Sequence, residues 1–377
     1  MSEERIIPAP ARRGVLVGGS GLIGGALMHY FKTETDDDIE VLAPNSKKLS
    51  LREPDDIRRY FHKYRPDFII NAAIAAIDSN PLLAYEINYL GSIRLANVAI
   101  DLNIPYIHLS SSAIMPMAEE LKEDDVLPLT ASMSNYAKSK LMAEFTLRHW
   151  HRTRGLDYTN IRLAVVYGKH DHKIQGFHRL LFSIANQAMP IMLTREGVRH
   201  SYSYSKKIPS FVHYVLDNRE EFSGQTYNFV DQDPVELADI ILTIKSYLGL
   251  KTPREIYLPY QLTSIGKSCT KWILRKLSAV GIEARMPAEL LFMENFYKSQ
   301  TLSSEKIRNS SYRDPSANAS VYSTLPELIE YYLTRWEHLN LINFNEEFFD
   351  PKKQAEEFLR TPDRLLETIH DGKTEVG

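Results

Sequence analysis

Hydrophobic and polar positions alternate with two different periods along the first half of the chain. Short apolar runs predict buried strands, and the segments between them carry apolar residues at helical spacing. The predicted strands cover residues 14–18, 39–43, 67–71, 104–110 and 158–166. The predicted helices cover residues 22–33, 54–64, 82–102 and 133–154. Because strands and helices alternate, the pattern predicts an α/β fold with a doubly wound parallel sheet.

A glycine-rich turn joins the first predicted strand to the first predicted helix. Gly18, Gly21 and Gly24 follow the apolar run Val15–Val17. The first glycine allows a tight turn, the second leaves the backbone open to a pyrophosphate, and the third lets the helix pack closely on the strand. The helix N-terminus adds N–H groups and the positive end of the helix dipole. The turn therefore predicts a Rossmann-type domain that binds a dinucleotide beyond the carboxyl ends of its strands.

The alternation weakens after Gly168 and gives way to a mostly helical pattern. Residues 226–230 form one more apolar run, which predicts a strand that returns to the sheet. Thr324 and Glu327 have the spacing of a capping box and predict the start of an amphipathic helix over residues 325–339. The chain is expected to contain a Rossmann domain over 12–168, a smaller, mostly helical substrate lobe over 169–342, and an acidic C-terminal extension over 343–377.

Composition narrows the class of protein. Of the 377 residues, 44% are hydrophobic, which is enough for a large core. The 45 lysines and arginines nearly balance the 48 aspartates and glutamates, so no nucleic-acid surface is expected. The single cysteine, Cys269, excludes an internal disulfide and a cysteine-rich metal site. The charged first residues and the lack of a long apolar run predict a cytoplasmic protein without a membrane span.

A tyrosine and a lysine stand four residues apart on the predicted helix over 133–154. Tyr136 and Lys140 therefore share one face of that helix. A lysine ammonium beside a tyrosine favours the phenolate and lowers the pKa of the phenol toward the range of acid–base catalysis. Alone, the pair also fits a surface helix without a chemical role. The Ser110–Ser112 run, at the end of the fourth strand, adds a hydroxyl that can hydrogen-bond the carbonyl oxygen that a tyrosine protonates.

The order of these motifs resembles the short-chain dehydrogenase/reductase superfamily. Segments 65–73, 84–91 and 108–116 are similar to its extended branch, the epimerase/dehydratase family, and above all to dTDP-4-dehydrorhamnose reductases and GDP-fucose synthases. The resemblance covers about residues 13–340 and is strongest up to Gly168. It implies an NAD(P)-dependent oxidoreductase that reduces a keto group on a nucleotide-activated sugar.

The resemblance also implies a role for individual residues. Ser111 would orient the substrate carbonyl, Tyr136 would donate the proton, and Lys140 would bind the nicotinamide ribose and tune the tyrosine. The other expected cofactor contacts are Gly18, Ser20, Gly21, Leu22, Ile23, Gly24, Asn45, Ser46, Lys47, Ser50, Leu51, Ala72, Ala73 and Asn88. The candidate substrate contacts are Ser112, His178 and Arg199. No metal site is expected, because the His170–His172 pair has no third ligand nearby in the sequence.

Departures from the family pattern narrow the reaction. Dehydratases of this branch place an acid pair directly after the strand-four hydroxyl, where this chain has Ser112 and Ala113. GDP-fucose synthases use a cysteine for epimerisation at the position of Ala113. Simple carbonyl reduction therefore fits best. A nucleotide-sugar epimerase, a hydroxysteroid-type dehydrogenase with the same Ser/Tyr/Lys site, and a non-catalytic cofactor-binding regulatory subunit are the alternatives.

The residues after the second strand bear on the choice of cofactor. NAD is usually bound there by an acidic residue that contacts the ribose diol. Segment 43–48 has no acid and contains Lys47 and Lys48, which suit a 2′-phosphate. NADP(H) is therefore expected to be preferred over NAD(H), although the segment also fits an ordinary polar turn.

Two of the predicted helices carry more apolar residues than one sheet face requires. Relatives pair the corresponding helices across a two-fold axis, which predicts a homodimer. The apolar residues in question are Leu83, Ile87, Leu90, Ile93, Leu141 and Phe145.

Overall fold

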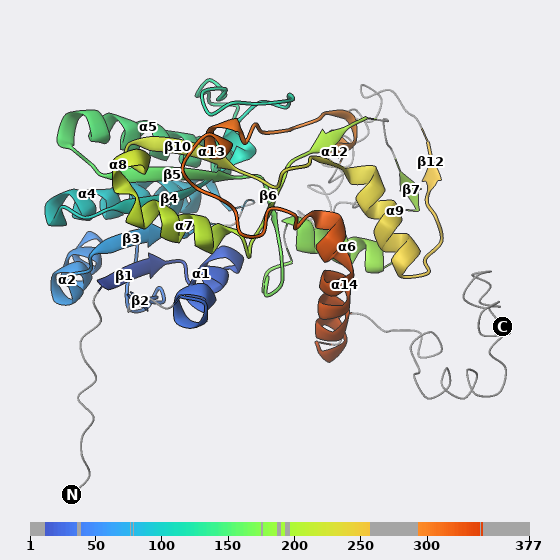
Figure 1. Ribbon diagram of the computed structural model, residues 1–377, viewed down its shortest axis with the longest axis horizontal. Helices are drawn as coiled ribbons and strands as arrows, with labels where there is room; N and C mark the ends of the chain where they lie inside the picture. Colours follow the sequence, from blue (N-terminus) through green and yellow to red (C-terminus); the bar gives the residue numbers. More distant parts are fainter. Residues whose placement is uncertain are drawn as a thin grey trace, which may run out of the picture.

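The centre of the protein is a parallel sheet of six strands (Figure 1). The computed structural model describes residues 12–35, 39–75, 77, 79–174, 176–186, 190–192, 197–256, 293–339 and 341. The strands follow the order β10-β5-β4-β3-β1-β2, and every neighbouring pair is parallel. Their bounds are β1 (Arg12–Val17), β2 (Ile39–Leu42), β3 (Phe68–Asn71), β4 (Tyr106–Ser111), β5 (Tyr158–Leu163) and β10 (Gln225–Phe229).

Helices cover both faces of this sheet, because its strands are apolar on both sides. One face packs against α1 (Leu22–Thr33), α7 (Ile208–Asp217), α8 (Arg219–Phe222) and α13 (Glu305–Arg308). The opposite face packs against α2 (Pro54–Tyr64), α4 (Ser92–Leu102) and α5 (Asn135–Arg154). The expected doubly wound sheet is confirmed, and the run over 226–230 joins it as the edge strand β10 beside β5.

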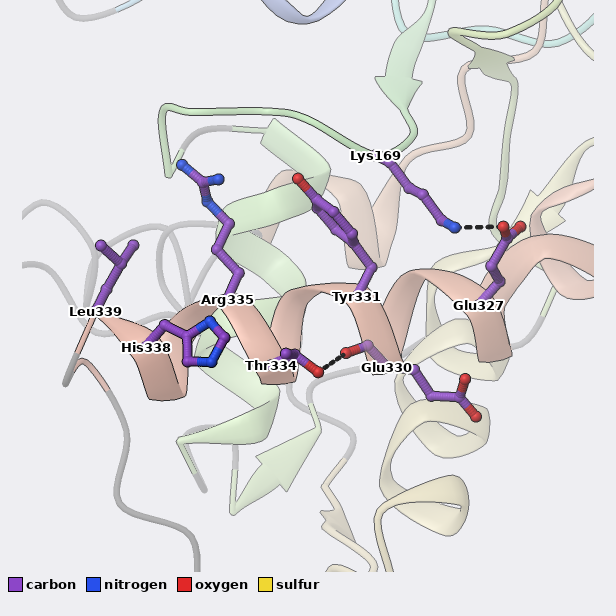
Figure 2. Close-up of a pocket in the computed structure, with 8 residues that line it drawn as sticks. All are labelled: Lys169, Glu327, Glu330, Tyr331, Thr334, Arg335, His338 and Leu339. Carbon is purple, nitrogen blue, oxygen red and sulfur yellow. Dashed lines mark hydrogen bonds and ion pairs between the residues drawn. The ribbon is translucent and has the colours of Figure 1, made fainter.

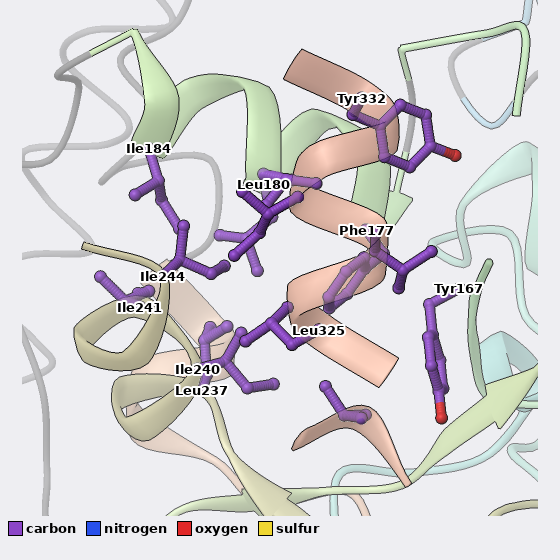
Figure 3. Close-up of a cluster of buried hydrophobic side chains, with 14 of the residues drawn as sticks. Tyr167, Phe177, Leu180, Ile184, Leu237, Ile240, Ile241, Ile244, Leu325 and Tyr332 are labelled. Carbon is purple, nitrogen blue, oxygen red and sulfur yellow. The ribbon is translucent and has the colours of Figure 1, made fainter. Parts of the chain in front are cut away.

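A second lobe lies beyond the carboxyl ends of the strands (Figure 1). Its helices are α6 (Gly176–Ala185), α9 (Leu237–Tyr247), α12 (Met293–Tyr297) and α14 (Val321–His338). Its short strands are β6 (Val165–Tyr167), β7 (Ile191–Met192), β8 (Arg199–His200), β9 (Tyr202–Tyr204), β11 (Val235–Glu236) and β12 (Arg254–Glu255). Its core forms between α6, α9 and α14, where Leu180, Ile244 and Leu325 interdigitate with their neighbours (Figure 3).

Local differences from the sequence prediction have identifiable causes. The strand expected over 158–166 is interrupted at Ala164, whose N–H donates to Ser203 Oγ instead of continuing the ladder. The helix expected over 82–102 consists of α3 (Pro81–Ala84), a π-helix, η1 (Tyr85–Gly91), and α4.

The start expected for the last helix is wrong. Helix α14 begins one turn earlier, because Ser320 and Ser323 form the capping box that Thr324 and Glu327 were expected to form. The expected extension over 343–377 lies outside the described residues. In the part of the chain that the structure describes, no helix combines the length and apolar character that a membrane span needs.

Candidate active site

Three loops converge at the carboxyl edge of the sheet around the glycine turn. Gly18 has a φ of +94°, and a Cβ there would lie 2.6 Å from the backbone of Ala72 and of Ala73. A Cβ on Gly19 would lie 2.7 Å from the Cβ of Ala43. The turn after β1 therefore packs directly against the loops after β3 and β2, and glycine is needed for this close approach.

The remaining two glycines of the motif differ in what they face. A Cβ on Gly24 would lie 2.1 Å from the carbonyl oxygen of Gly18, so this glycine lets α1 pack against the turn. A Cβ on Gly21 would touch only that same oxygen, at 3.5 Å, and Gly21 is exposed with a φ of −81°. Nothing in the described part of the chain requires a glycine there.

The start of α1 is open to an anion. Among the residues that the structure describes, no side chain caps its N-terminus, and its first turn contains no acidic residue. Open space at Gly21, beside a helix N-terminus, is the arrangement that a pyrophosphate requires. The residues present therefore fit a dinucleotide; Ser20 precedes Gly21, and Leu22 and Ile23 begin α1.

The loop after β2 is a polar turn held by its own asparagine. Asn45 Oδ1 accepts hydrogen bonds from the backbone N–H groups of Lys47 and Lys48, both at 3.1 Å. Ser50 Oγ accepts one from the N–H of Arg52 at 3.3 Å, and Leu51 is buried. Asn45 and Ser50 thus shape the turn, while the exposed side chains of Ser46 and Lys47 are left to meet a ligand.

The loop after β3 is fixed by two buried asparagines. Asn71 Oδ1 accepts from the N–H of Ala73 at 3.1 Å, and Asn88 Oδ1 accepts from the N–H of Ala75 at 2.8 Å. Asn88 Nδ2 donates to Ser139 Oγ on α5 at 3.1 Å. Asn88 lies inside the π-helix η1, a rare conformation that is frequent at functional sites. It therefore connects the loop expected to face the nicotinamide to the helix that carries Tyr136.

The structure brings Ser111, Tyr136 and Lys140 together. Ser111 ends β4, where its Oγ accepts a hydrogen bond from the N–H of Ala113 at 3.2 Å, and its side chain lies near enough to the Tyr136 side chain at the start of α5 to lower the pKa of that phenol. Ser134 caps α5 by accepting from the N–H of Ala137, which fixes where the helix begins and which face it buries. One turn further along, Lys140 Nζ donates to the carbonyl oxygen of Leu109 on β4 at 2.8 Å. All three residues lie at the carboxyl edge of the sheet.

Burial dominates the electrostatics of this group. It raises the pKa of Tyr136, and the Ser111 side chain lowers it in part. The sequence argument expected the lysine to lower this pKa, but in the structure desolvation is the larger effect. Burial also lowers the pKa of Lys140 to about 8, although the charge of Glu144 raises it. At neutral pH the site therefore holds a protonated phenol beside an ammonium group.

Ser112 is turned away from this group. Its hydroxyl donates to Gln300 Oε1 at 3.3 Å, and Gln300 Nε2 donates to the carbonyl oxygens of Ser112, Met115 and Pro116. Gln300, which is far away in the sequence, thus holds the loop that follows Ser111 through hydrogen bonds. Sequence reasoning missed it, because no local pattern marks a glutamine that contacts backbone carbonyls.

Of the other two candidate substrate residues, His178 is buried and Arg199 is exposed. His178 belongs to α6, not to a loop, and is buried, with Trp336 Nε1 donating to its Nε2 at 2.9 Å and its Nδ1 bonded to the Lys173 carbonyl oxygen. Burial lowers its pKa to about 4, and its packing against Trp336 accounts for its position. Arg199 is exposed on β8. Its Nη2 lies 3.5 Å from Oε2 of Glu119, which belongs to the loop that follows β4.

A groove of about 560 Å³ lies along α14 (Figure 2), and none of the residues that line it belongs to the Ser–Tyr–Lys group. It is lined by Lys169, Glu327, Glu330, Tyr331, Thr334, Arg335, His338 and Leu339. Two residues of this groove hydrogen-bond the histidines at 170 and 172: the Tyr331 hydroxyl contacts His170 Nδ1, and Arg335 Nη2 donates to His172 Nδ1. The groove therefore does not gather the residues expected from the sequence.

Comparisons with known proteins agree with this geometry. Residues 15–229 match the model of the NAD dependent epimerase/dehydratase family. The GDP-L-fucose synthase of Dictyostelium discoideum is 26% identical over 268 residues, 64% of this chain and 81% of the relative. The dTDP-glucose 4,6-dehydratase of Salmonella typhimurium is 24% identical over 294 residues, 67% of this chain and 81% of the relative.

The fold is shared with solved structures as well. The UDP-glucose 4-epimerase of Thermotoga maritima superposes with a TM-score of 0.65 at 16% identity, covering 86% of this chain and 99% of that structure. The chain therefore belongs to the NAD-dependent epimerase/dehydratase family and is an NAD(P)-dependent enzyme of the extended short-chain dehydrogenase/reductase type.

Proposed function

We propose that this protein is a cytoplasmic reductase that converts a keto group on a nucleotide-activated sugar to an alcohol, with NADPH as the hydride donor. The observation that carries the proposal is the Ser111–Tyr136 pair, with Lys140 one turn away, at the edge where the glycine turn is open to a dinucleotide. The substrate class is supported by the names of relatives, which include a GDP-L-fucose synthase and a dTDP-4-dehydrorhamnose reductase.

The proposed mechanism assigns one task to each residue. The Ser111 hydroxyl donates a hydrogen bond to the substrate carbonyl oxygen and orients it. Tyr136, whose raised pKa keeps it protonated, transfers its proton to that oxygen. The Lys140 ammonium stabilises the resulting phenolate and can bind the ribose hydroxyls of the cofactor. When bound, NADPH supplies the hydride, while the chain supplies position and the proton.

Reduction is proposed over dehydration, and over epimerisation at a carbon next to a keto group, because of the residues next to Ser111. Both of these reactions remove a proton from carbon and so need a base near the sugar. Ser112 is engaged by Gln300, and Ala113 has no group that can accept a proton. Epimerisation by oxidation and re-reduction of one carbon needs only the Ser–Tyr–Lys group, and it is separated from reduction by the consumption of NADPH. The names of relatives include a dehydratase and an epimerase, so the family alone does not select the reaction.

We propose NADPH rather than NADH because of the turn after β2. Its exposed lysines, Lys47 and Lys48, stand where an acidic residue would otherwise contact the ribose diol. Asn45 is committed to shaping the turn, so Ser46 and Lys47 are the proposed contacts of the 2′-phosphate.

We also propose a homodimer, based on an exposed apolar surface along α3, η1 and α5. Leu82 is 61% exposed, Tyr85 43% and Phe145 38%, and α5 packs directly on α3 and η1. Exposed apolar residues gathered on neighbouring helices mark an interaction surface. Leu141 does not contribute to this surface, because it is fully buried in the core with Ile114.

Replacing Tyr136 with phenylalanine tests the proposal. The change removes one oxygen and keeps the ring, so unfolding temperature and NADPH affinity should stay close to those of the wild type. Turnover should fall about 10²–10⁴-fold, the loss expected for a positioned acid. Lys140→Met should weaken cofactor binding and lower turnover together. Unchanged turnover in Tyr136→Phe would overturn the assignment and favour a regulatory, cofactor-binding role.

A further inference from the structure

A buried ion pair between Glu144 and Arg162 lies next to the proposed catalytic residues. Glu144 is one turn beyond Lys140 on α5, and Arg162 is on β5, with side chains only 2% and 0% exposed. Arg162 Nη2 donates to Glu144 Oε2 at 2.7 Å, and Arg162 Nε donates to the same carboxylate. Ser110 Oγ donates to Glu144 Oε1 at 2.5 Å. One carboxylate thus joins α5 to the neighbouring strands β4 and β5.

A buried ion pair is by itself weak evidence for a role in stability. Removing two charges from water is costly, and buried ion pairs are often replaced by apolar side chains without loss of stability. Neither residue belongs to the Ser–Tyr–Lys group, and neither is accounted for by the glycine turn. The position of the carboxylate relative to that group therefore needs an explanation.

Glu144 contacts the chain at the point where Ser111 and Lys140 are fixed. Its partner Ser110 precedes Ser111, and the carbonyl oxygen that anchors Lys140 Nζ belongs to Leu109, the residue before Ser110. Holding Ser110 in place therefore also holds its two neighbours, Leu109 and Ser111. The Leu109 carbonyl oxygen stays in position to accept the hydrogen bond from Lys140, and Ser111 stays in position beside Tyr136.

Glu144 also determines the charge around Lys140. It raises the lysine pKa, which burial would otherwise lower further. Among the described residues, two other titratable groups lie around the lysine: Tyr136 on α5 and His108 on β4. Arg162 on β5 is paired with the Glu144 carboxylate. Asn88 on η1 is neutral. His108 has a strongly lowered pKa, through burial and through Lys140 itself, and so adds no charge. The carboxylate is the one negative charge in this group.

We propose that Glu144 is a positioning residue for carbonyl reduction, which holds the end of β4 through Ser110 and keeps the Lys140 ammonium charged beside Tyr136. This inference rests on the proposed function, because it assumes that the charged Lys140 ammonium takes part in the reaction. Its first test, however, needs no substrate.

The first test is the titration of Lys140 in Glu144→Gln. Glutamine keeps the shape and an acceptor for Ser110 but removes the charge. The Lys140 side chain is followed by NMR in protein labelled at the lysine ε-carbon, and Lys140→Met assigns its signal. The wild-type midpoint should lie near pH 8. In Glu144→Gln it should fall by about one pH unit, the size of shift caused by one nearby opposite charge.

The second test is the pH profile of turnover. The alkaline limb should move toward lower pH in Glu144→Gln by the same amount as the NMR midpoint. The double variant Glu144→Gln/Arg162→Met removes the guanidinium that the single variant leaves unpaired, and should recover folding stability but not the wild-type profile. Asp157→Asn is the matched control, because its ion pair with Arg219 precedes β5, at the opposite end of the strand from the site. It should lower the unfolding temperature without moving either titration.

The outcomes separate the two proposals. An unchanged Lys140 midpoint in Glu144→Gln, or a wild-type pH profile in the double variant, would show a merely structural pair and overturn the inference. A shifted midpoint in a protein that reduces no keto sugar would support the coupling between Glu144 and Lys140 and contradict the proposed function.

Discussion

A methyl group on Gly21 should abolish tight cofactor binding without harming the fold. The backbone at Gly21 has φ −81° and ψ 171°, which alanine adopts freely. The added Cβ would make one ordinary contact, 3.5 Å from the Gly18 carbonyl oxygen. Losing a glycine favours folding slightly, and replacing it at a helix N-cap opposes folding by a similar amount. The free energy of unfolding should therefore change by less than about 1 kcal/mol.

The matched comparison is Gly24→Ala, three residues along. Its Cβ would lie 2.1 Å from the Gly18 carbonyl oxygen and 2.7 Å from the Gly19 Cα. Both neighbours are backbone atoms, so α1 and the turn must move apart. Such overpacking typically costs about 1–3 kcal/mol. Gly24→Ala should thus lose stability, whereas Gly21→Ala should lose only affinity.

Two measurements distinguish these effects. Thermal unfolding without cofactor reports stability, and titration of NADPH by its fluorescence reports the dissociation constant. For Gly21→Ala we expect the unfolding temperature of the wild type. We expect its dissociation constant for NADPH to be at least about tenfold higher, which corresponds to about 1.4 kcal/mol of binding free energy. If Gly21→Ala binds NADPH as tightly as the wild type, the pyrophosphate does not lie against this turn, and the placement of the cofactor is refuted.

Three further predictions follow from the same geometry. NADPH should bind more tightly than NADH, and Lys47→Glu should narrow the difference; equal dissociation constants in the wild type would contradict this. Light scattering should give a dimeric mass at micromolar concentration, and Leu82→Glu should give a monomer. Turnover should fall as the pH rises through about 8, because the Lys140 ammonium is the working form and its pKa is lowered to about 8; a constant rate up to pH 10 would exclude that role.

The sequence predicted those parts of the fold that depend on local pattern. Helices α1 and α2 begin and end where their apolar spacing predicts, at 22–33 and 54–64. The alternation of strands and helices also placed Ser111 at a strand end and Tyr136 near the start of a helix, so the central group was predictable. Spacing along a helix was sufficient to put Tyr136 and Lys140 on one face.

Features that depend on distant contacts were not predictable. The π-helix η1 holds Asn88, which contacts Ala75 and Ser139 on two other elements. The burial of His178 depends on Trp336, 158 residues away in the sequence. Gln300 acts on backbone carbonyls, which leave no mark in the sequence of the loop that it holds. A sequence pattern describes one element at a time, whereas these contacts exist only between elements.

The most direct test of the central claim is a count of NADPH consumed against product formed. A panel of nucleotide-activated keto sugars is offered with NADPH deuterated at the transferred position, and the product is analysed by NMR. We expect one substrate to consume one NADPH per molecule and to carry the deuterium on the former carbonyl carbon, with Tyr136→Phe about 10²–10⁴-fold slower. An epimerised or dehydrated product formed without net consumption of NADPH would contradict the account.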